Sequence, residues 1–176
     1  MTVNPFLHII YIFKVWIVLT VVKGKVLSMR ISAKGRYGLA AAISMAENYN
    51  SGEYITVISI SERLGISKIY LEQVFSLLKR GGIVTSVKGA QGGYQLARNP
   101  RQITVLDVLS AVELSLFEQA EETVKSKAPE IEAAMRVSVF DVIDGAVKNT
   151  LENITLSDLV NEAEKHRTDQ GFMFFI

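Results

Sequence analysis

Polar and basic side chains repeat along residues 68–76 and recur at Lys88, and their types suit hydrogen bonding to nucleic acid. The exposed positions expected in the first stretch are Lys68, Ile69, Tyr70, Glu72, Gln73 and Ser76. Polar side chains on a helix can enter a major groove and meet base edges there. Lys88 lies beside the glycine-rich stretch 89–93, whose bare backbone can approach phosphates or a minor groove closely. These residues therefore predict the recognition of duplex DNA.

Two predicted helices and a tight turn would position the first set of side chains. Thr56 is expected to cap a short first helix, and Gly65 suits the turn because it tolerates backbone angles that other residues resist. Ser67 is a natural cap for the second helix. The apolar face expected for that helix consists of Leu71, Val74, Phe75 and Leu78.

A predicted β-hairpin follows the second helix. Gly81 and Gly82 would end the helix, and β-type runs at 83–87 and 94–97 flank the glycine-rich tip. A helix-turn-helix followed by a basic hairpin is a winged helix-turn-helix, so we expect a mainly α fold of this kind with a long dimerisation helix. Winged helices also serve as protein-interaction modules, so the fold alone leaves both functions open.

The charge distribution favours the DNA-binding interpretation. Residues 29–103 hold ten Lys or Arg against four Asp or Glu, and residues 104–176 hold six against fourteen. The net charge of +1 therefore hides a basic half that contains the winged helix and an acidic half that follows it. Such a split is expected when one end of a protein faces phosphate and the other does not.

Catalytic and metal-binding patterns are missing from the sequence. The chain has no Cys and only two His, His8 and His166, so it offers no thiolate site and no Ser-His-Asp triad. The spacing Gly89-x-x-Gly92-Gly93 is too short and wrongly placed for a nucleotide-binding loop. We therefore expect no enzyme activity, no cofactor and a cytoplasmic protein.

The first 28 residues carry an apolar run, 6–22, of 17 residues that is interrupted by His8 and Lys14. Three interpretations compete: a weak membrane anchor, a buried extra helix, or translated sequence upstream of the natural start. We favour the last, because Met29 opens a stretch that makes sense as an N-terminus. Residues 1–28 are accordingly expected to lie outside the native fold, with no membrane contact.

Residues 29–103 are expected to form the DNA-binding domain, opening with a helix that Ser32 caps and that runs to about Asn48. Arg30, Lys34 and Arg36 cluster at the start of this helix. Phosphate could contact these cations and also the free amides of the helix N-terminus. Each cation could equally be a solvated surface residue.

Residues 104–165 are expected to form a dimerisation region. Thr104 and Asp107 have the spacing of a capping box, and a long helix is predicted at about 130–149. One helix of that length cannot bury a wide apolar face against so small a head, so we expect it to pair with a second subunit rather than pack within one. A symmetric dimer would present two recognition helices to an inverted repeat. The stripe assigned to dimerisation comprises Ile131, Met135, Val139, Val142, Ile143 and Ala146.

The C-terminal part is predicted to contain a short helix capped by Thr155, a charged linker at 164–170, and a tail, 166–176, with an apolar end. The tail ends in Phe174, Phe175 and Ile176, and exposed aromatic residues at a free end are an aggregation liability. One interpretation is a plug that docks on the body or on the partner subunit. The other is a peptide that another protein captures by its carboxylate and apolar side chain.

Three sequence blocks resemble a known family: MRISAKGRYGL, then ISERLGIS-x-x-YLEQ-x-F, then LLKRGGIVTSVKGAQGGYQLAR. Together they resemble the winged-helix regulators that include the iron–sulfur cluster regulator and the nitric-oxide-sensing repressor, over about residues 29–160. The resemblance implies a homodimer that binds duplex DNA. It also implies that Lys88, where many members have Arg, is the basic wing residue, and that the recognition-helix contacts are Ser67, Tyr70, Glu72 and Gln73.

Cluster-binding members carry three Cys in the window that corresponds to 113–131, and this sequence has none there. The chain instead resembles the cysteine-free branch, which includes the repressor of cysteine metabolism of Gram-positive bacteria. That resemblance implies a repressor of cysteine or sulfur metabolism that senses cysteine supply by complexing cysteine synthase (O-acetylserine thiol-lyase). Ile176 would then enter the enzyme's active site, as the C-terminal isoleucine of serine acetyltransferase does. The alternative is a winged-helix interaction module without DNA binding, attached to a membrane by residues 1–28.

Overall fold

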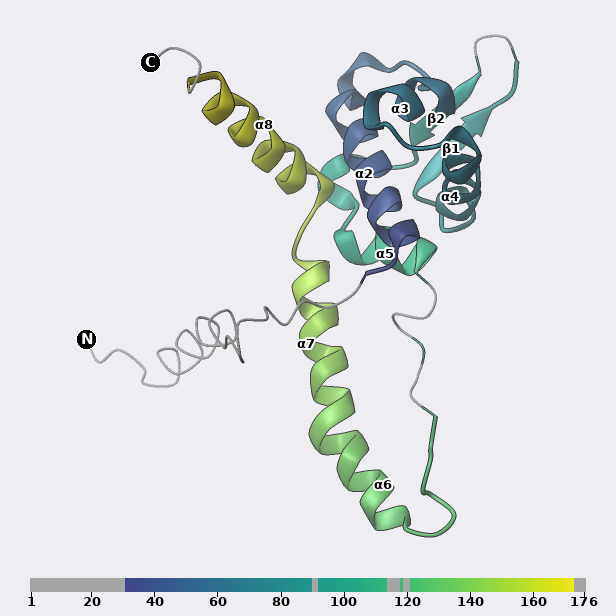
Figure 1. Cartoon of the computed structure of the whole chain (residues 1–176), viewed down its shortest axis with the longest axis vertical. Helices are drawn as coiled ribbons and strands as arrows, with labels where there is room; N and C mark the ends of the chain where they lie inside the picture. The colour runs from purple at the N-terminus through teal and green to yellow at the C-terminus, as the bar shows by residue number, and fades with distance from the viewer. Residues whose placement is uncertain (1–30, 90–91, 114–117, 119–120, 173–176) are drawn as a thin grey trace, which may run out of the picture. The chain divides into compact units, whose positions relative to one another are not determined.

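The computed structural model describes residues 31–89, 92–113, 118 and 121–172. Three helices and a hairpin form the head of the molecule in the expected order: α2 (Ala33–Glu47), α3 (Val57–Leu64), α4 (Lys68–Arg80), β1 (Val84–Val87) and β2 (Gly93–Leu96). Helix α5 (Val105–Val112) then closes the head (Figure 1). The fold is therefore mainly α, and it is a winged helix-turn-helix as the sequence predicts.

The helix boundaries of the head follow from capping side chains that the sequence reveals. Thr56 Oγ1 accepts a hydrogen bond from the Ser59 N–H at the start of α3, at 3.1 Å. Gly65 ends α3 with φ 64°, in the left-handed region that favours glycine. Ser67 occupies the N-cap position of α4, but its side chain makes no capping hydrogen bond, so the capping role expected of it is wrong.

The hairpin is a two-stranded antiparallel sheet in which Val84 pairs with Leu96 and Val87 with Gly93. Ile55 extends it through a single bridge to Tyr94, with N···O distances of 2.9 and 2.8 Å. A Cβ on Gly93 would lie 2.7 Å from the Ile55 carbonyl oxygen, so only glycine permits this close approach. The bridge ties the wing to the segment before α3.

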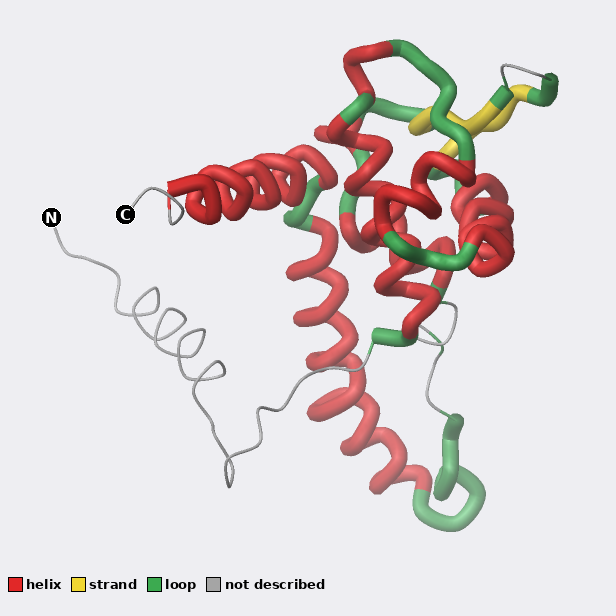
Figure 2. Tube along the Cα trace, turned by 45° about the horizontal axis from the view of Figure 1, so that its top comes forward, coloured by secondary structure: helices red, strands yellow, loops and turns green. Residues whose placement is uncertain are grey.

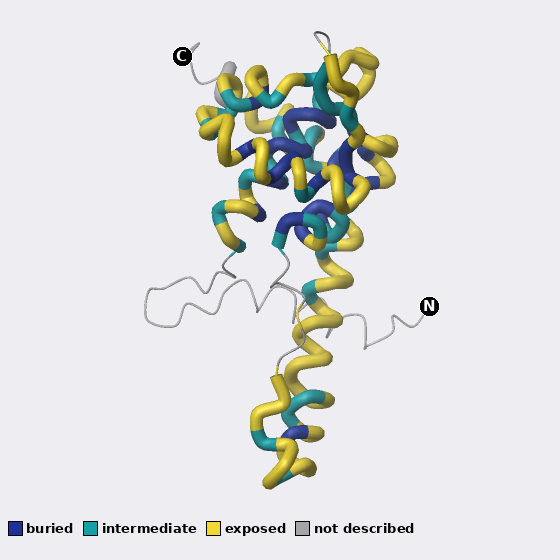
Figure 3. Tube along the Cα trace, turned by 90° about the vertical axis from the view of Figure 1, so that its right-hand side faces the viewer, coloured by how far each residue is buried: buried dark blue, intermediate teal, exposed yellow. Residues whose placement is uncertain are grey.

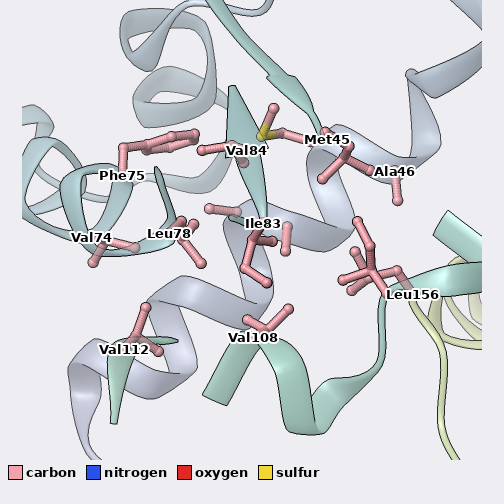
Figure 4. Close-up of a cluster of buried hydrophobic side chains, with 14 of the residues drawn as sticks. Met45, Ala46, Val74, Phe75, Leu78, Ile83, Val84, Val108, Val112 and Leu156 are labelled. Carbon is pink, nitrogen blue, oxygen red and sulfur yellow. The ribbon is translucent and has the colours of Figure 1, made fainter. Parts of the chain in front are cut away.

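The core of the head gathers apolar side chains from helices that lie far apart in the sequence (Figure 4). Phe75 and Leu78 of α4, Met45 of α2, and Val108 of α5 are all buried. Leu156, at the start of helix α8, is also fully buried in this cluster. The predicted apolar face of α4 is therefore confirmed, and the chain after the long helix returns to complete the same core.

The long helix runs from Pro129 to Glu152 in three segments: α6 (Pro129–Met135), a π-helical segment (Arg136–Phe140) and α7 (Asp141–Glu152). Pro129 lies in its first turn, where the missing N–H of proline costs no helical hydrogen bond. Figure 3 draws most of this helix in yellow, the colour of exposed residues. The π-helical segment shifts the phase of the side chains that follow it, and such segments often mark functional positions.

The last helix, α8 (Leu156–Phe172), is much longer than the short helix predicted, and the predicted charged linker at 164–170 is wrong because these residues are helical (Figure 2). Thr155 and Asp158 hydrogen bond to each other at its start. Glu162 pairs with Lys165 at 3.0 Å one turn later, and such pairs stabilise helices. Lys165, whose side chain is 70% exposed, therefore lies on a solvated face of a helix and not in a linker.

Glu47 joins α8 to the head. Its carboxylate, whose side chain is only 13% exposed, forms ion pairs with Arg63 of α3 and Arg167 of α8. Arg63 also donates to Ser44 Oγ of α2 at 3.1 Å. One carboxylate thus connects three helices at the C-terminal end of α2.

Several expectations concern residues outside the described segments, namely the apolar extension 1–28, Arg30, and the terminal Phe174, Phe175 and Ile176. Within the described part of the chain, no helix combines the length and the apolar run that crossing a membrane requires.

Candidate nucleic-acid interface

The outward face of α4 is the first component of the interface. Its buried face is made of Leu71, Val74, Phe75 and Leu78, and the opposite side of the helix is exposed. The exposed residues with spacing i, i+3, i+4 and i+7, which share one face of a helix, are Ile69, Glu72, Gln73 and Ser76. The core therefore orients this face toward solvent, where a DNA groove can reach it.

Lys34 of α2 lies beside that face. A shallow surface hollow is lined by Lys34, Ile69, Glu72, Gln73, Ser76 and Leu77. The structure thus brings a cation from the first turn of one helix next to the hydrogen-bonding side chains of another. An ammonium group in this place can contact a phosphate while α4 occupies the adjoining groove.

Tyr70 is held by a neighbouring aromatic ring. The rings of Tyr70 and Tyr37 meet edge to face, with centroids 5.5 Å apart and planes at 88°. Tyr70 is still 44% exposed, so part of the residue remains accessible while α2 supports the ring.

Glu72 is paired within its own helix. Lys68 Nζ lies 3.1 Å from Glu72 Oε1, and both side chains are about half exposed. Because a solvated ion pair of this kind contributes little to stability, it can open when a base presents a donor to the carboxylate. Glu72 can then accept a hydrogen bond from a cytosine amino group.

The wing presents Lys88 on an exposed turn. Gly89 has φ 129°, and its carbonyl accepts a hydrogen bond from the Gly92 N–H at 3.0 Å. Lys79, near the end of α4, donates to Ser86 Oγ of β1 at 2.6 Å and braces the wing against the recognition helix. The bracing role of Lys79 has no signal in the sequence, because it depends on how the hairpin folds back.

Two of the backbone amides at the start of α2, those of Ser32 and Gly35, have partners within the chain, and the phosphate contact expected here stays a prediction. Ser32 Oγ accepts from the Gly35 N–H at 3.2 Å, and the Ser32 N–H donates to Glu113 Oε2 at 3.1 Å. The Ser32 hydroxyl also hydrogen bonds to this carboxylate. A negative group from the end of α5 thus lies at this helix N-terminus, and Ser32 and Glu113 are too distant in sequence to reveal it. Arg36 remains exposed on the same helix.

A second candidate surface lies along the long helix. Ile131, Val139, Val142 and Ile143 are between 45% and 61% exposed, and Ala146 is exposed as well. Met135 is partly buried. All six belong to the stripe assigned to dimerisation, and so much exposed apolar surface along one helix is unusual for a monomeric protein.

A winged helix-turn-helix with an exposed polar face on its second helix and a basic wing is the arrangement expected of a winged-helix transcriptional regulator. The chain matches the Rrf2 family, described as an iron-dependent transcriptional regulator, over residues 31–162, and it belongs to that family. It is therefore a regulator of transcription in a family whose members bind DNA and typically dimerise.

Individual relatives agree with this assignment. The HTH-type transcriptional regulator IscR of Cronobacter sakazakii is 38% identical over 136 residues, which cover 77% of this chain and 83% of that protein. The solved structure of T. potens IscR is 34% identical, with a TM-score of 0.62 over 84% of this chain and 98% of that one. The structure of CymR, the global cysteine regulator of B. subtilis, is 34% identical, with a TM-score of 0.58 over 77% of this chain and 98% of that one.

The family's description names iron, and the side chains of this chain decide which iron sites it can form. Iron–sulfur clusters are held by Cys thiolates, and the sequence contains no Cys. Among the described residues, no three His, Asp or Glu side chains come together as a metal site. A thiolate-bound cluster therefore does not fit this chain.

Proposed function

We propose that the protein is a homodimeric repressor that binds an inverted DNA repeat. One observation carries this proposal: the exposed face of α4 shares its hollow with Lys34, so base-reading and phosphate-binding groups lie together. The family supplies the general activity, which is transcription regulation.

The residues divide into two roles under this proposal. The cations Arg30, Lys34, Arg36 and Lys88 contact phosphates or, in the case of the wing, a minor groove. The base edges are read by Ser67, Tyr70, Glu72 and Gln73. Lys88 fits a narrow minor groove less well than arginine would, so the wing contributes affinity more than sequence preference.

The dimer in this proposal forms through the apolar stripe of the long helix. The side chains of Val142 and Ile143 are more than half exposed in a single chain, and a second copy of the same helix would cover them. Two heads related by a twofold axis would then meet two half-sites of an inverted repeat.

We also propose that the target genes serve cysteine or sulfur metabolism and that the protein senses cysteine supply through cysteine synthase. Support comes from the similarity to CymR and from the tail that ends in Phe174, Phe175 and Ile176. An apolar C-terminal peptide with a free carboxylate suits capture in an enzyme's active site.

Titration of the full chain against duplexes from its own promoter tests the DNA-binding part of the proposal. Binding should be specific and should weaken steeply with salt, because counterions are released from phosphates. Glu72→Ala should change the sequence preference, whereas Lys88→Ala should weaken binding to all sequences alike. If no duplex is preferred, even at low ionic strength and with cysteine synthase added, the protein is an interaction module without DNA binding.

Deletion of residues 174–176 tests the sensing part. The truncated protein should remain dimeric but lose co-purification with cysteine synthase. A synthetic peptide of residues 166–176 should compete for the enzyme when its carboxylate is free, and the matched peptide with an amidated end should not. Retained co-purification after the deletion would show that the tail is not the contact.

A further inference from the structure

Ile69 is more exposed than any other large apolar side chain in the described segments. Its side chain is 71% exposed, although it lies in the first turn of a helix whose other large apolar residues are mostly buried. A single exposed isoleucine is ordinary on a protein surface. What distinguishes Ile69 is its position on the helix.

Ile69 shares one face of α4 with the residues that face DNA. Glu72 and Gln73 follow it at i+3 and i+4, so the three side chains lie next to one another. Ile69 also lines the same hollow as Lys34. In helix-turn-helix proteins the N-terminal residues of the second helix contact base edges, and Ile69 is the second residue of α4.

The base edges of the DNA major groove limit what an apolar side chain at this position can contact. Base edges in the major groove present donors and acceptors, and the apolar group among them is the C5-methyl of thymine. We propose that Ile69 contacts a thymine methyl in each half-site and so determines part of the sequence preference, an inference that rests on the DNA-binding function proposed above. A β-branched side chain in a helix has one strongly preferred χ1 rotamer, so Ile69 loses little freedom on binding.

The test replaces thymine by deoxyuridine, which removes the methyl group and leaves base pairing unchanged. Duplexes selected from a random library by the full-length protein are substituted at each thymine in turn, symmetrically in both half-sites. Loss of one buried methyl contact corresponds to about fourfold in affinity per half-site, and to about 15-fold for the symmetric site. Wild-type protein should show this loss at one thymine of the half-site.

Ile69→Ala should bind the unsubstituted duplex as weakly as wild type binds the deoxyuridine duplex, and it should be indifferent to the substitution. The matched control is Ile58→Ala, which truncates an isoleucine 53% exposed on α3 and outside the hollow. That variant should retain the full difference between thymine and deoxyuridine. Circular dichroism and the dimer mass should be unchanged in both variants, because both side chains are exposed.

Two results would overturn the inference while leaving the proposed function intact. One is wild-type protein that binds its selected duplex but responds to no deoxyuridine substitution. The other is Ile69→Ala protein that discriminates against deoxyuridine as strongly as wild type. If wild-type protein selects no sequence, the proposed function fails, and the inference fails with it.

Discussion

Truncation of Ile143 on the long helix should weaken the proposed dimer. The side chain is 54% exposed in one protomer and lies in the apolar stripe assigned to dimerisation. Complete burial of an isoleucine contributes about 2 kcal/mol, so covering the exposed half contributes about 1 kcal/mol. A symmetric interface buries two copies, and their loss costs about 2 kcal/mol, which corresponds to about a 30-fold higher dissociation constant.

Sedimentation velocity over a dilution series measures this effect directly. Ile143→Ala should shift the monomer–dimer midpoint to about 30-fold higher concentration. The matched control is Val137→Ala, since Val137 is 66% exposed on the same helix but lies two residues before Val139 and so on the opposite side. The reasoning is refuted if both variants dissociate alike, because the stripe would then have no special role.

Three further outcomes are expected. Lys88→Ala should lower affinity for every duplex. In anisotropy titrations it should also reduce the slope of log affinity against log salt by about 0.9 per protomer, because one phosphate contact is lost. An unchanged slope would mean that Lys88 does not contact phosphate. Glu47→Ala should lower the free energy of unfolding, measured in urea, by about 2 kcal/mol, because Arg63 and Arg167 lose charge-assisted hydrogen bonds to a largely buried carboxylate. The control is Glu62→Ala at an exposed site, and an equal loss there would contradict the role given to Glu47. Thr155 donates hydrogen bonds to the Asp158 carboxylate and so lowers its pKa below the ordinary value of 3.8. Asp158 therefore stabilises α8 fully above pH 3.8, and this stabilisation is lost as the pH falls through the lowered pKa. Thermal unfolding should therefore show Asp158→Asn less stable than wild type at neutral pH, with the difference disappearing well below pH 3.8; a constant difference would exclude Asp158 as its source.

Much of the head could be predicted because its signals are local. Thr56 is three residues from the amide that it caps, and Thr104 and Asp107 complete a capping box within one turn. The apolar spacing of α4 predicts its buried face, and the same spacing leaves Glu72 and Gln73 exposed. Each of these features depends on backbone geometry within a turn or two, so the residue types suffice.

Two features differ from what the local composition predicts. The polar run 164–170 suggests a linker, yet ion pairs one turn apart and the contact between Arg167 and Glu47 accompany a continuous helix there. Ser67 has the residue type of a cap, but its hydroxyl makes no capping bond. The residue type limits which interactions a side chain can make, and the neighbouring groups determine which of those interactions form.

The sequence by itself determined the winged helix-turn-helix, the exposed face of α4 and the apolar stripe of the long helix. Only the tertiary structure decided that Glu113 occupies the start of α2, that Lys34 lies beside α4, and that Glu47 holds both Arg63 and Arg167. The physical reason is the range of each interaction. Helix faces and turns are set by neighbours within a few residues, whereas these contacts join groups that become neighbours only after the core around Phe75 and Leu156 has closed.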